Sequence, residues 1–144
     1  MVIITLDGFR WQEVFGGADS ALISNSDVTL DTSTNKALYW SSSFEERRKK
    51  LMPFLWNVVA SRGQIFGNRN YNNNVNVSNP YALSYPGYSE LLTGSVDFSI
   101  TGNHRKKNQN RNVLEVLNSN KSYSGKVAAF TSWDMFPYIL NEER

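Results

Sequence analysis

The sequence predicts an α/β fold in which a mostly parallel sheet is flanked by helices. Two continuous apolar runs, residues 2–6 and 127–131, are typical of strands that are buried on both faces, and the first is rich in β-branched residues. Helical patterns lie between them, and alternation of strand and helix favours parallel pairing through right-handed crossovers. We therefore expect the two runs to be neighbouring strands in the interior of one sheet.

The length and composition set the scale of the fold. A chain of 144 residues with 40% apolar content can form one domain with a core, so we expect residues 1–144 to be a single α/β unit. The chain has 15 Lys and Arg against 13 Asp and Glu. A net charge of +2 gives no general reason to expect a nucleic acid or a membrane surface as partner.

The absence of cysteine and of long apolar runs limits the possible chemistry and location of the chain. Without cysteine there are neither disulfides nor thiolate ligands, so a zinc ion would need oxygen and imidazole ligands, and His104 is the one imidazole. No apolar run approaches the length of a membrane span. Met1 is followed at once by a strand-like segment, so we expect no signal peptide within this chain.

The first third of the chain starts with the strand at 2–6, which ends at Asp7-Gly8. Residues 9–19 have no clean period and predict a loop or a short irregular helix. Residues 20–42 are rich in Ser, Asn, Asp and Thr, which is typical of a surface excursion.

The next stretch has two helical signals. Ser43 and Glu46 have the spacing of a capping box, which predicts a solvated helix through the charged residues 45–50. After Pro53 the apolar residues repeat with helical spacing, and Gly63 ends the pattern, so we expect this helix to pack on the sheet. The stripe consists of Leu51, Phe54, Leu55, Val58 and Val59.

The remaining elements follow the same rules. Short strands are expected at 64–68 and 75–77, and residues 95–111, which include His104, predict a solvated loop. Asn112 and Glu115 repeat the capping pattern for a short helix. After the strand at 126–131, a last helix is expected from Pro137.

The stretch from 83 to 94 contains the candidate nucleophile. Pro86 suits the first position of a helix, and Gly94 suits its end, which places Ser84 just outside the helix N-terminus. There a hydroxyl faces unpaired backbone N–H groups and the positive end of the helix dipole, where an alkoxide or a phosphoryl group is stabilised. The alternative is that Ser84 only caps the helix.

Asp7 is the candidate metal ligand. It follows a predicted parallel strand, and ligands of open α/β sheets bind at the carboxyl edge of the strands. We therefore expect Asp7 and Ser84 to face one shared cleft. The alternative is that Asp7-Gly8 forms a simple turn, because this pair is common in turns.

These residues carry a family resemblance. Ser84-Tyr85-Pro86 with the Leu91–Gly94 stretch, together with the upstream Leu6-Asp7-Gly8, resembles the alkaline phosphatase superfamily. The phosphodiesterase/nucleotide pyrophosphatase and phosphoglyceromutase-like branches are the most similar. The resemblance implies that Asp7 binds a metal and that Ser84 is the metal-bound nucleophile. Gly87 and Tyr88 stand where the pyrophosphatase branch commonly has Asn and His.

The resemblance also implies an activity. It suggests an alkaline-phosphatase-like fold and a bacterial metal-dependent phosphoester hydrolase or phosphotransferase that acts on small-molecule phosphate esters. The cofactors would be divalent metal ions, namely two Zn or alternatively Mn, and the location periplasmic or secreted. The family places further Asp and His ligands downstream of the nucleophile, where this chain has only His104. We therefore expect the N-terminal part of a larger catalytic domain, with little activity alone.

Two other functions are compatible with the sequence. A sulfatase-like hydrolase has Cys or Ser two residues before a Pro, but its signature resembles Cys/Ser-x-Pro-x-Arg and Tyr88 stands in place of the Arg. A non-catalytic module that binds a glycan or a phosphorylated ligand would use the 13% aromatic content and the Asn-rich loops.

Overall fold

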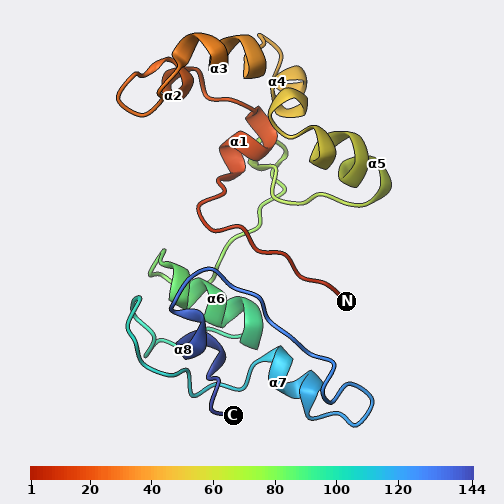
Figure 1. The fold of residues 1–144 in the computed structure, drawn as a ribbon, viewed down its shortest axis with the longest axis vertical. Helices are drawn as coiled ribbons and strands as arrows, with labels where there is room; N and C mark the ends of the chain where they lie inside the picture. The colour runs from red at the N-terminus through yellow and green to blue at the C-terminus, as the bar shows by residue number, and fades with distance from the viewer. The chain divides into compact units, whose positions relative to one another are not determined.

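The computed structural model describes residues 1–144 and contains helices but no β-strand. The chain forms two compact units, Met1–Val75 and Asn76–Arg144; Figure 1 labels α1 to α5 in the first and α6 to α8 in the second. The prediction of an α/β fold with a mostly parallel sheet is therefore wrong. That these residues are part of a larger catalytic domain stays a prediction.

The two runs expected to be interior strands are exposed segments without secondary structure. Val2 is 85% exposed, Ile4 81% and Phe130 96%. A strand forms only where a neighbouring segment pairs with its backbone N–H and C=O groups, and no ladder joins either run to another part of the chain. The ranges 64–68 and 75–77 also lack strand pairing. The apolar pattern correctly marks β-favouring residues, but the pattern alone does not supply the pairing partner.

The first unit is made of short helical segments joined by turns. The region expected to be a surface excursion contains two of its helices, whose first N–H groups are capped by Asp19 and Asp31. The predicted helix at 45–50 is confirmed, and the Ser43 hydroxyl accepts a hydrogen bond from the backbone N–H of Glu46 at its start. The segments are α1 (Trp11–Gly16), α2 (Ser20–Ser24), α3 (Thr32–Tyr39), α4 (Phe44–Leu51), the π-helix η1 (Leu55–Val59), α5 (Ala60–Arg62) and the 3₁₀-helix η2 (Arg69–Tyr71).

Helix α1 packs on α4 through a glycine and an arginine. Gly17, with φ of 74° and ψ of −158°, lies so close to α4 that an added Cβ would be 2.4 Å from the Arg47 backbone carbon. The Arg47 guanidinium carbon lies 4.4 Å from the ring centre of Trp40 and 4.5 Å from that of Phe44. Its Nε donates a hydrogen bond to the Gly16 carbonyl at 3.2 Å. These contacts join α1, α3 and α4 around one buried, stacked cation.

The helical stripe after Pro53 does not pack as expected. Its region is helical as far as Gly63, but Phe54 is 69% exposed and Val59 39% exposed, since the unit has no sheet to cover them. The contact that holds this region comes from another face of η1. The Trp56 indole N–H donates to the Val14 carbonyl at 3.0 Å, and its ring meets the Phe15 ring edge-on.

The second unit consists of α6 (Ser84–Thr93), α7 (Val113–Asn118) and α8 (Phe136–Leu140). Its core is built from Tyr85, Met135 and Ile139, which are 2%, 4% and 1% exposed. Three sequence signals are confirmed: the capping box of Asn112 with Glu115, the left-handed C-cap at Gly94, and a proline in the first turn of α8.

Buried asparagine side chains link the loops of the second unit. Asn108 is 2% exposed; its backbone N–H donates to the Tyr138 carbonyl, and its side-chain amide donates to the Ser89 hydroxyl at 3.0 Å. Asn141 donates to the Asn108 carbonyl at 2.9 Å. Asn112 is 1% exposed and donates to the Leu140 carbonyl. Three of these bonds end on backbone carbonyls, of Tyr138, Asn108 and Leu140, and thereby pair backbone groups of loops and helix ends.

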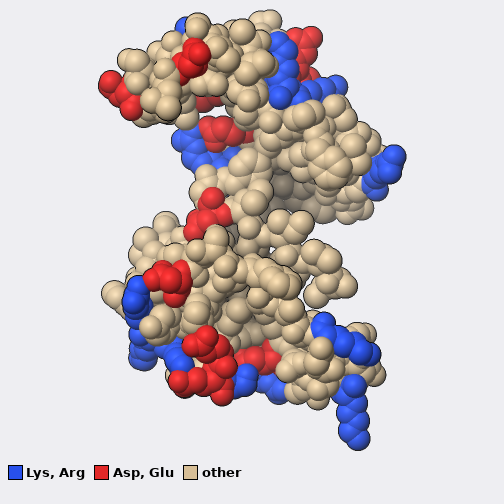
Figure 2. All heavy atoms as spheres, in the orientation of Figure 1, with Lys and Arg blue, Asp and Glu red and all other residues tan.

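Charged side chains of both signs cover the surface. On the face shown in Figure 2, Lys and Arg lie close to Asp and Glu in each unit, which agrees with a net charge of only +2. None of the helices has the length and apolar character needed to cross a bilayer.

The close approach at Gly17 leads to a stability prediction. Gly17→Ala should destabilise the first unit by about 2–4 kcal/mol, because the Cβ meets the Arg47 backbone and the φ/ψ pair is nearly exclusive to glycine. Gly8→Ala is the control, since Gly8 has a similar φ of 73° but no atom within 4 Å of an added Cβ. Urea unfolding followed by tryptophan fluorescence measures both. Equal losses in the two variants would show that the contact with α4 is unimportant.

Candidate functional site

Ser84 is the first residue of α6, so the helix begins two residues earlier than the sequence predicts. The N-cap is Leu83, which is extended and makes no side-chain capping bond. Pro86 therefore occupies the third helical position and not the first. Ser84 is therefore inside the helix, and it is not the N-cap that the sequence left open as an alternative. Its side chain is half-buried at the positive end of a ten-residue helix.

The backbone donors at this end of α6 are mostly in use. The Tyr85 N–H donates to the Asn103 side-chain oxygen at 2.9 Å, and the Gly87 N–H donates to the Leu83 carbonyl at 3.1 Å. Pro86 has no N–H to offer. An anion at this helix end would therefore depend on the dipole and on side chains more than on a ring of vacant N–H groups.

Tyr85 fixes the start of α6 in the second unit. Its hydroxyl is directed at two backbone carbonyls, Lys106 at 2.7 Å and Tyr138 at 3.2 Å. Burial, and secondarily the negative charge of Asp97, raises the pKa of this phenol. Tyr85 therefore stays protonated at neutral pH and acts as a donor that holds the 102–109 loop against α6 and α8.

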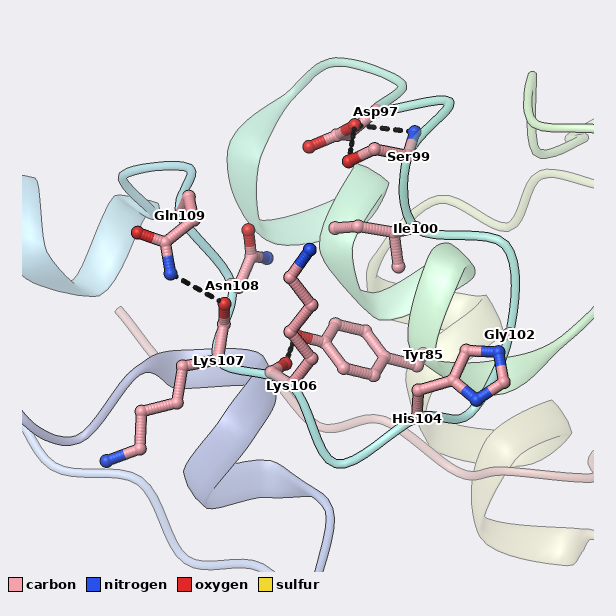
Figure 3. Close-up of a pocket in the computed structure, with 10 residues that line it drawn as sticks. All are labelled: Tyr85, Asp97, Ser99, Ile100, Gly102, His104, Lys106, Lys107, Asn108 and Gln109. Carbon is pink, nitrogen blue, oxygen red and sulfur yellow. Dashed lines mark hydrogen bonds between the residues drawn. The ribbon is translucent and has the colours of Figure 1, made fainter.

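A small cavity of about 60 Å³ lies beside Tyr85. Figure 3 shows the Lys106 side chain running past the Tyr85 ring, His104 near the opposite edge of that ring, and Lys107 directed away. Lys107 instead forms an ion pair with Glu143. This volume is less than half of the roughly 150 Å³ that holds benzene in an apolar protein interior, so the cavity is small.

The charges around this cavity largely balance. The Asp97 carboxylate accepts hydrogen bonds from the Ser99 hydroxyl, the Asn110 amide and the Ser99 N–H, which lower its pKa, so it is ionised at neutral pH. Lys106 lies close enough to lower that pKa further. His104 and Arg105 are exposed, and Arg105 pairs with Asp134. The solvated character expected for this loop is confirmed, except at the buried Gly102 and Asn108.

Asp7 lies in an exposed turn with Gly8 in the first unit, whereas Ser84 belongs to the second. Asp7 and Gly8 thus form a turn, as in the alternative given for this pair in the sequence analysis. The expected meeting of Asp7 and Ser84 in one cleft stays a prediction.

The residues offer only part of a metal centre. No group of three or more His, Cys, Asp or Glu side chains converges on one point. Asp7 and Ser84 could supply two oxygen ligands, fewer than the three protein ligands of a catalytic zinc site. The residues of this chain therefore do not by themselves fit two zinc ions.

The most important supporting residues at this site were not identified from the sequence. Tyr85, Asn103 and Asn108 act through partners 18 to 53 positions away. Asn108 stood in a polar stretch that indicated a solvated loop. No local pattern distinguishes a buried asparagine from an exposed one.

Glu90 holds the segment that precedes Ser84. Its carboxylate accepts hydrogen bonds from the Ser78 N–H at 2.7 Å, the Asn79 N–H at 3.0 Å and the Asn79 amide at 2.8 Å. The Ser78 backbone bond and then the Asn79 side-chain bond lower the pKa of Glu90. Residues 78 and 79 are thereby fixed to the middle of α6, which constrains the approach of the chain to Ser84.

Comparison of the chain with protein-family models, with curated proteins and with solved structures gave no match.

The bonds to Glu90 predict an acid-sensitive second unit. A carboxyl group whose pKa is lower in the folded state stabilises that state above its unfolded pKa, near 4.5, and this stabilisation is lost as the pH falls through the folded value. Glu90→Gln should therefore flatten the fall in stability between pH 5 and the acid transition. Urea unfolding at several pH values, followed through Trp133, tests this. An unchanged pH profile in Glu90→Gln would contradict it.

Proposed function

We propose that this chain carries the serine nucleophile of a metal-dependent phosphoester hydrolase or phosphotransferase that acts on small-molecule phosphate esters. The observation that carries the proposal is the position of Ser84, in the sequence Ser84-Tyr85-Pro86, in the first turn of α6. The proposal rests on this motif and on the helix that presents it, and not on the sheet, since the sheet is absent.

The local geometry suits a reacting hydroxyl. The dipole of α6 stabilises the negative charge of the Ser84 oxygen once it is deprotonated, and that of a phosphoryl group at the same helix end. Tyr85, which is fully buried directly after Ser84, anchors the first turn and limits its motion. Precise positioning of the nucleophile is a large part of catalysis in phosphoryl transfer.

The metal would contribute chemistry that these residues lack. When bound, a divalent ion lowers the pKa of a coordinated hydroxyl and neutralises phosphoryl oxygens. Asp7 and Ser84 are the residues proposed to hold it, together with ligands from outside this set. No histidine or lysine adjacent to Ser84 in the sequence offers an alternative base.

The other two functions make different predictions. A sulfatase-like hydrolase would cleave sulfate esters in preference to phosphate esters. A non-catalytic phosphoryl-binding module is supported by one observation, the Lys106 and His104 side chains at the cavity beside Tyr85. The small volume and the nearby Asp97 carboxylate both weaken that alternative.

Replacement of Ser84 tests the nucleophile. In the intact gene product, supplied with Zn²⁺ or Mn²⁺, Ser84→Ala should abolish turnover of phosphomonoesters and phosphodiesters, because the attacking oxygen is lost. Stability should fall by less than the about 2 kcal/mol that loss of a strong N-cap costs, because the N-cap of α6 is Leu83 and not Ser84. The exposed Ser122→Ala is the control and should retain full activity. Near-wild-type rates in Ser84→Ala would rule out a phosphoserine intermediate, and preferential cleavage of sulfate esters would favour the sulfatase.

Replacement of Asp7 tests the metal ligand. Asp7→Asn should weaken metal binding first, so activity should be partly restored by added Zn²⁺ or Mn²⁺, whereas Ser84→Ala should not respond. Activity titrations against metal concentration compare the two variants. If Asp7→Asn has the metal dependence of the wild type, Asp7 is only a turn residue.

A further inference from the structure

The segment that leads into α6 contains a backbone conformation that its residue type does not favour. Ala82, two residues before Ser84, has a φ of 47°, which lies in the left-handed region. The other non-glycine residues with a positive φ are Asn72 and Asn141, and each is an asparagine at the C-cap of a helix, where this conformation is common. Ala82 is not an asparagine and ends no helix. It is also exposed, so packing of its own side chain does not hold it in this conformation.

Hydrogen bonds fix the chain just before this alanine. The Glu90 carboxylate accepts from the backbone N–H groups of Ser78 and Asn79. The Asn79 side-chain oxygen accepts from the Tyr81 N–H at 3.1 Å, and the Tyr81 hydroxyl donates to the Phe98 carbonyl at 2.9 Å. Residues 78–81 are therefore attached both to the middle of α6 and to the loop that follows it.

The chain just after the alanine is also fixed. Leu83 is extended, with φ of −124° and ψ of 156°, and the helix starts at the next residue. The Tyr85 N–H donates to the Asn103 side-chain oxygen at 2.9 Å, and its buried hydroxyl donates to the Lys106 carbonyl at 2.7 Å. Ala82 thus lies between two anchored stretches, and neither can move to relieve it without losing hydrogen bonds.

The spacing of the anchors explains why the chain bends here. Glu90 follows Ser84 by six residues on α6, which corresponds to about 9 Å along the helix axis. The five residue steps from Asn79 to Ser84 could extend over about 17 Å. The chain must therefore turn between these points, and a left-handed residue changes its direction sharply. Such a conformation costs free energy in a non-glycine residue and persists only where the surrounding structure fixes it.

We propose that Ala82 is a positioning residue for Ser84, because its left-handed bend directs the chain so that Ser84 enters the first turn of α6 in the orientation for attack. The inference rests on the proposed function, since it concerns the same nucleophile. Ala82 acts through the backbone of Leu83. If residue 82 relaxed to the extended region, the anchors on both sides could not all be kept and the start of α6 would shift. A displacement of about 1 Å at a reacting group can cost about a hundredfold in rate.

Substitutions at residue 82 test the bend in the intact gene product, with p-nitrophenyl phosphate and bis(p-nitrophenyl) phosphate as substrates and with Zn²⁺ or Mn²⁺ supplied. Ala82→Gly and Ala82→Asn tolerate the left-handed region and should keep kcat within about threefold. A β-branched residue does not tolerate it, so Ala82→Val should lower kcat at least about tenfold while KM changes less than about threefold. Asn72→Val is the matched control, because it disfavours a left-handed residue in the first unit and should leave kcat within about twofold. Circular dichroism establishes that each variant folds.

A double-mutant cycle tests whether the hydrogen bonds hold the bend. Tyr81→Phe keeps the ring and removes the bond to the Phe98 carbonyl. With alanine at position 82 the backbone can then relax, so Tyr81→Phe should lower kcat at least about fivefold. In the Ala82→Asn background the left-handed conformation is tolerated without this bond, and the same change should cost less than about twofold.

The outcomes separate this inference from the proposed function. A wild-type protein without activity, or full activity in Ser84→Ala, overturns the proposed function and with it the role of Ala82. If activity depends on Ser84 but a folded Ala82→Val keeps the wild-type kcat, only the inference is wrong. Equal losses of kcat in Ala82→Val and Asn72→Val, or equal effects of Tyr81→Phe in both backgrounds, also overturn the inference. The double-mutant cycle decides the question if Ala82→Val does not fold.

Discussion

The second unit depends on the need to satisfy buried backbone carbonyls without a sheet. A sheet pairs its backbone groups strand by strand, whereas loops packed against short helices must find partners one at a time. Asn112 and Asn141 provide such partners with their side-chain amides, and Asn108 with its backbone N–H, between the 102–112 segment and the end of the chain around α8. The Tyr85 hydroxyl does the same for the loop next to Ser84. The position of Ser84 therefore follows from polar bonds as much as from the small apolar core.

The helices with strong local signals could be predicted from the sequence. Ser43 before α4, the Asn112–Glu115 pair before α7 and Gly94 after α6 act within one turn of the residues they control. The sheet could not be predicted in the same way. The apolar run at 2–6 favours extended backbone, but a strand also needs a second segment, far away in the chain, to pair with its backbone groups. The apolar run at 2–6 was correctly identified as favouring extended backbone, but the strand predicted for it does not form.

The candidate site and the burial of side chains show the same division between local and distant information. That Ser84 lies at the start of a helix followed from Pro86 and Gly94, although the start was shifted by the extended Leu83. The burial of the Arg48 Nε had no visible signal, because Arg48 lies in a charged stretch that indicated a solvated helix. Its burial results from Trp56, which η1 brings over it from beyond Pro53. Burial of this kind becomes visible only in the tertiary structure.

The stacking of Arg47 limits how the sequence of the first unit can diverge. Its flat guanidinium fits between Trp40 and Phe44 while Nε bonds to Gly16. Lysine preserves the charge but has neither the plane nor the directed Nε–H, so the exchange is not conservative here. In a set of homologous sequences, a lysine at this position should be accompanied by replacement of one or both aromatic neighbours. Arg47, Trp40 and Phe44 thus form a unit of covariation, although seven positions separate the first aromatic residue from the arginine.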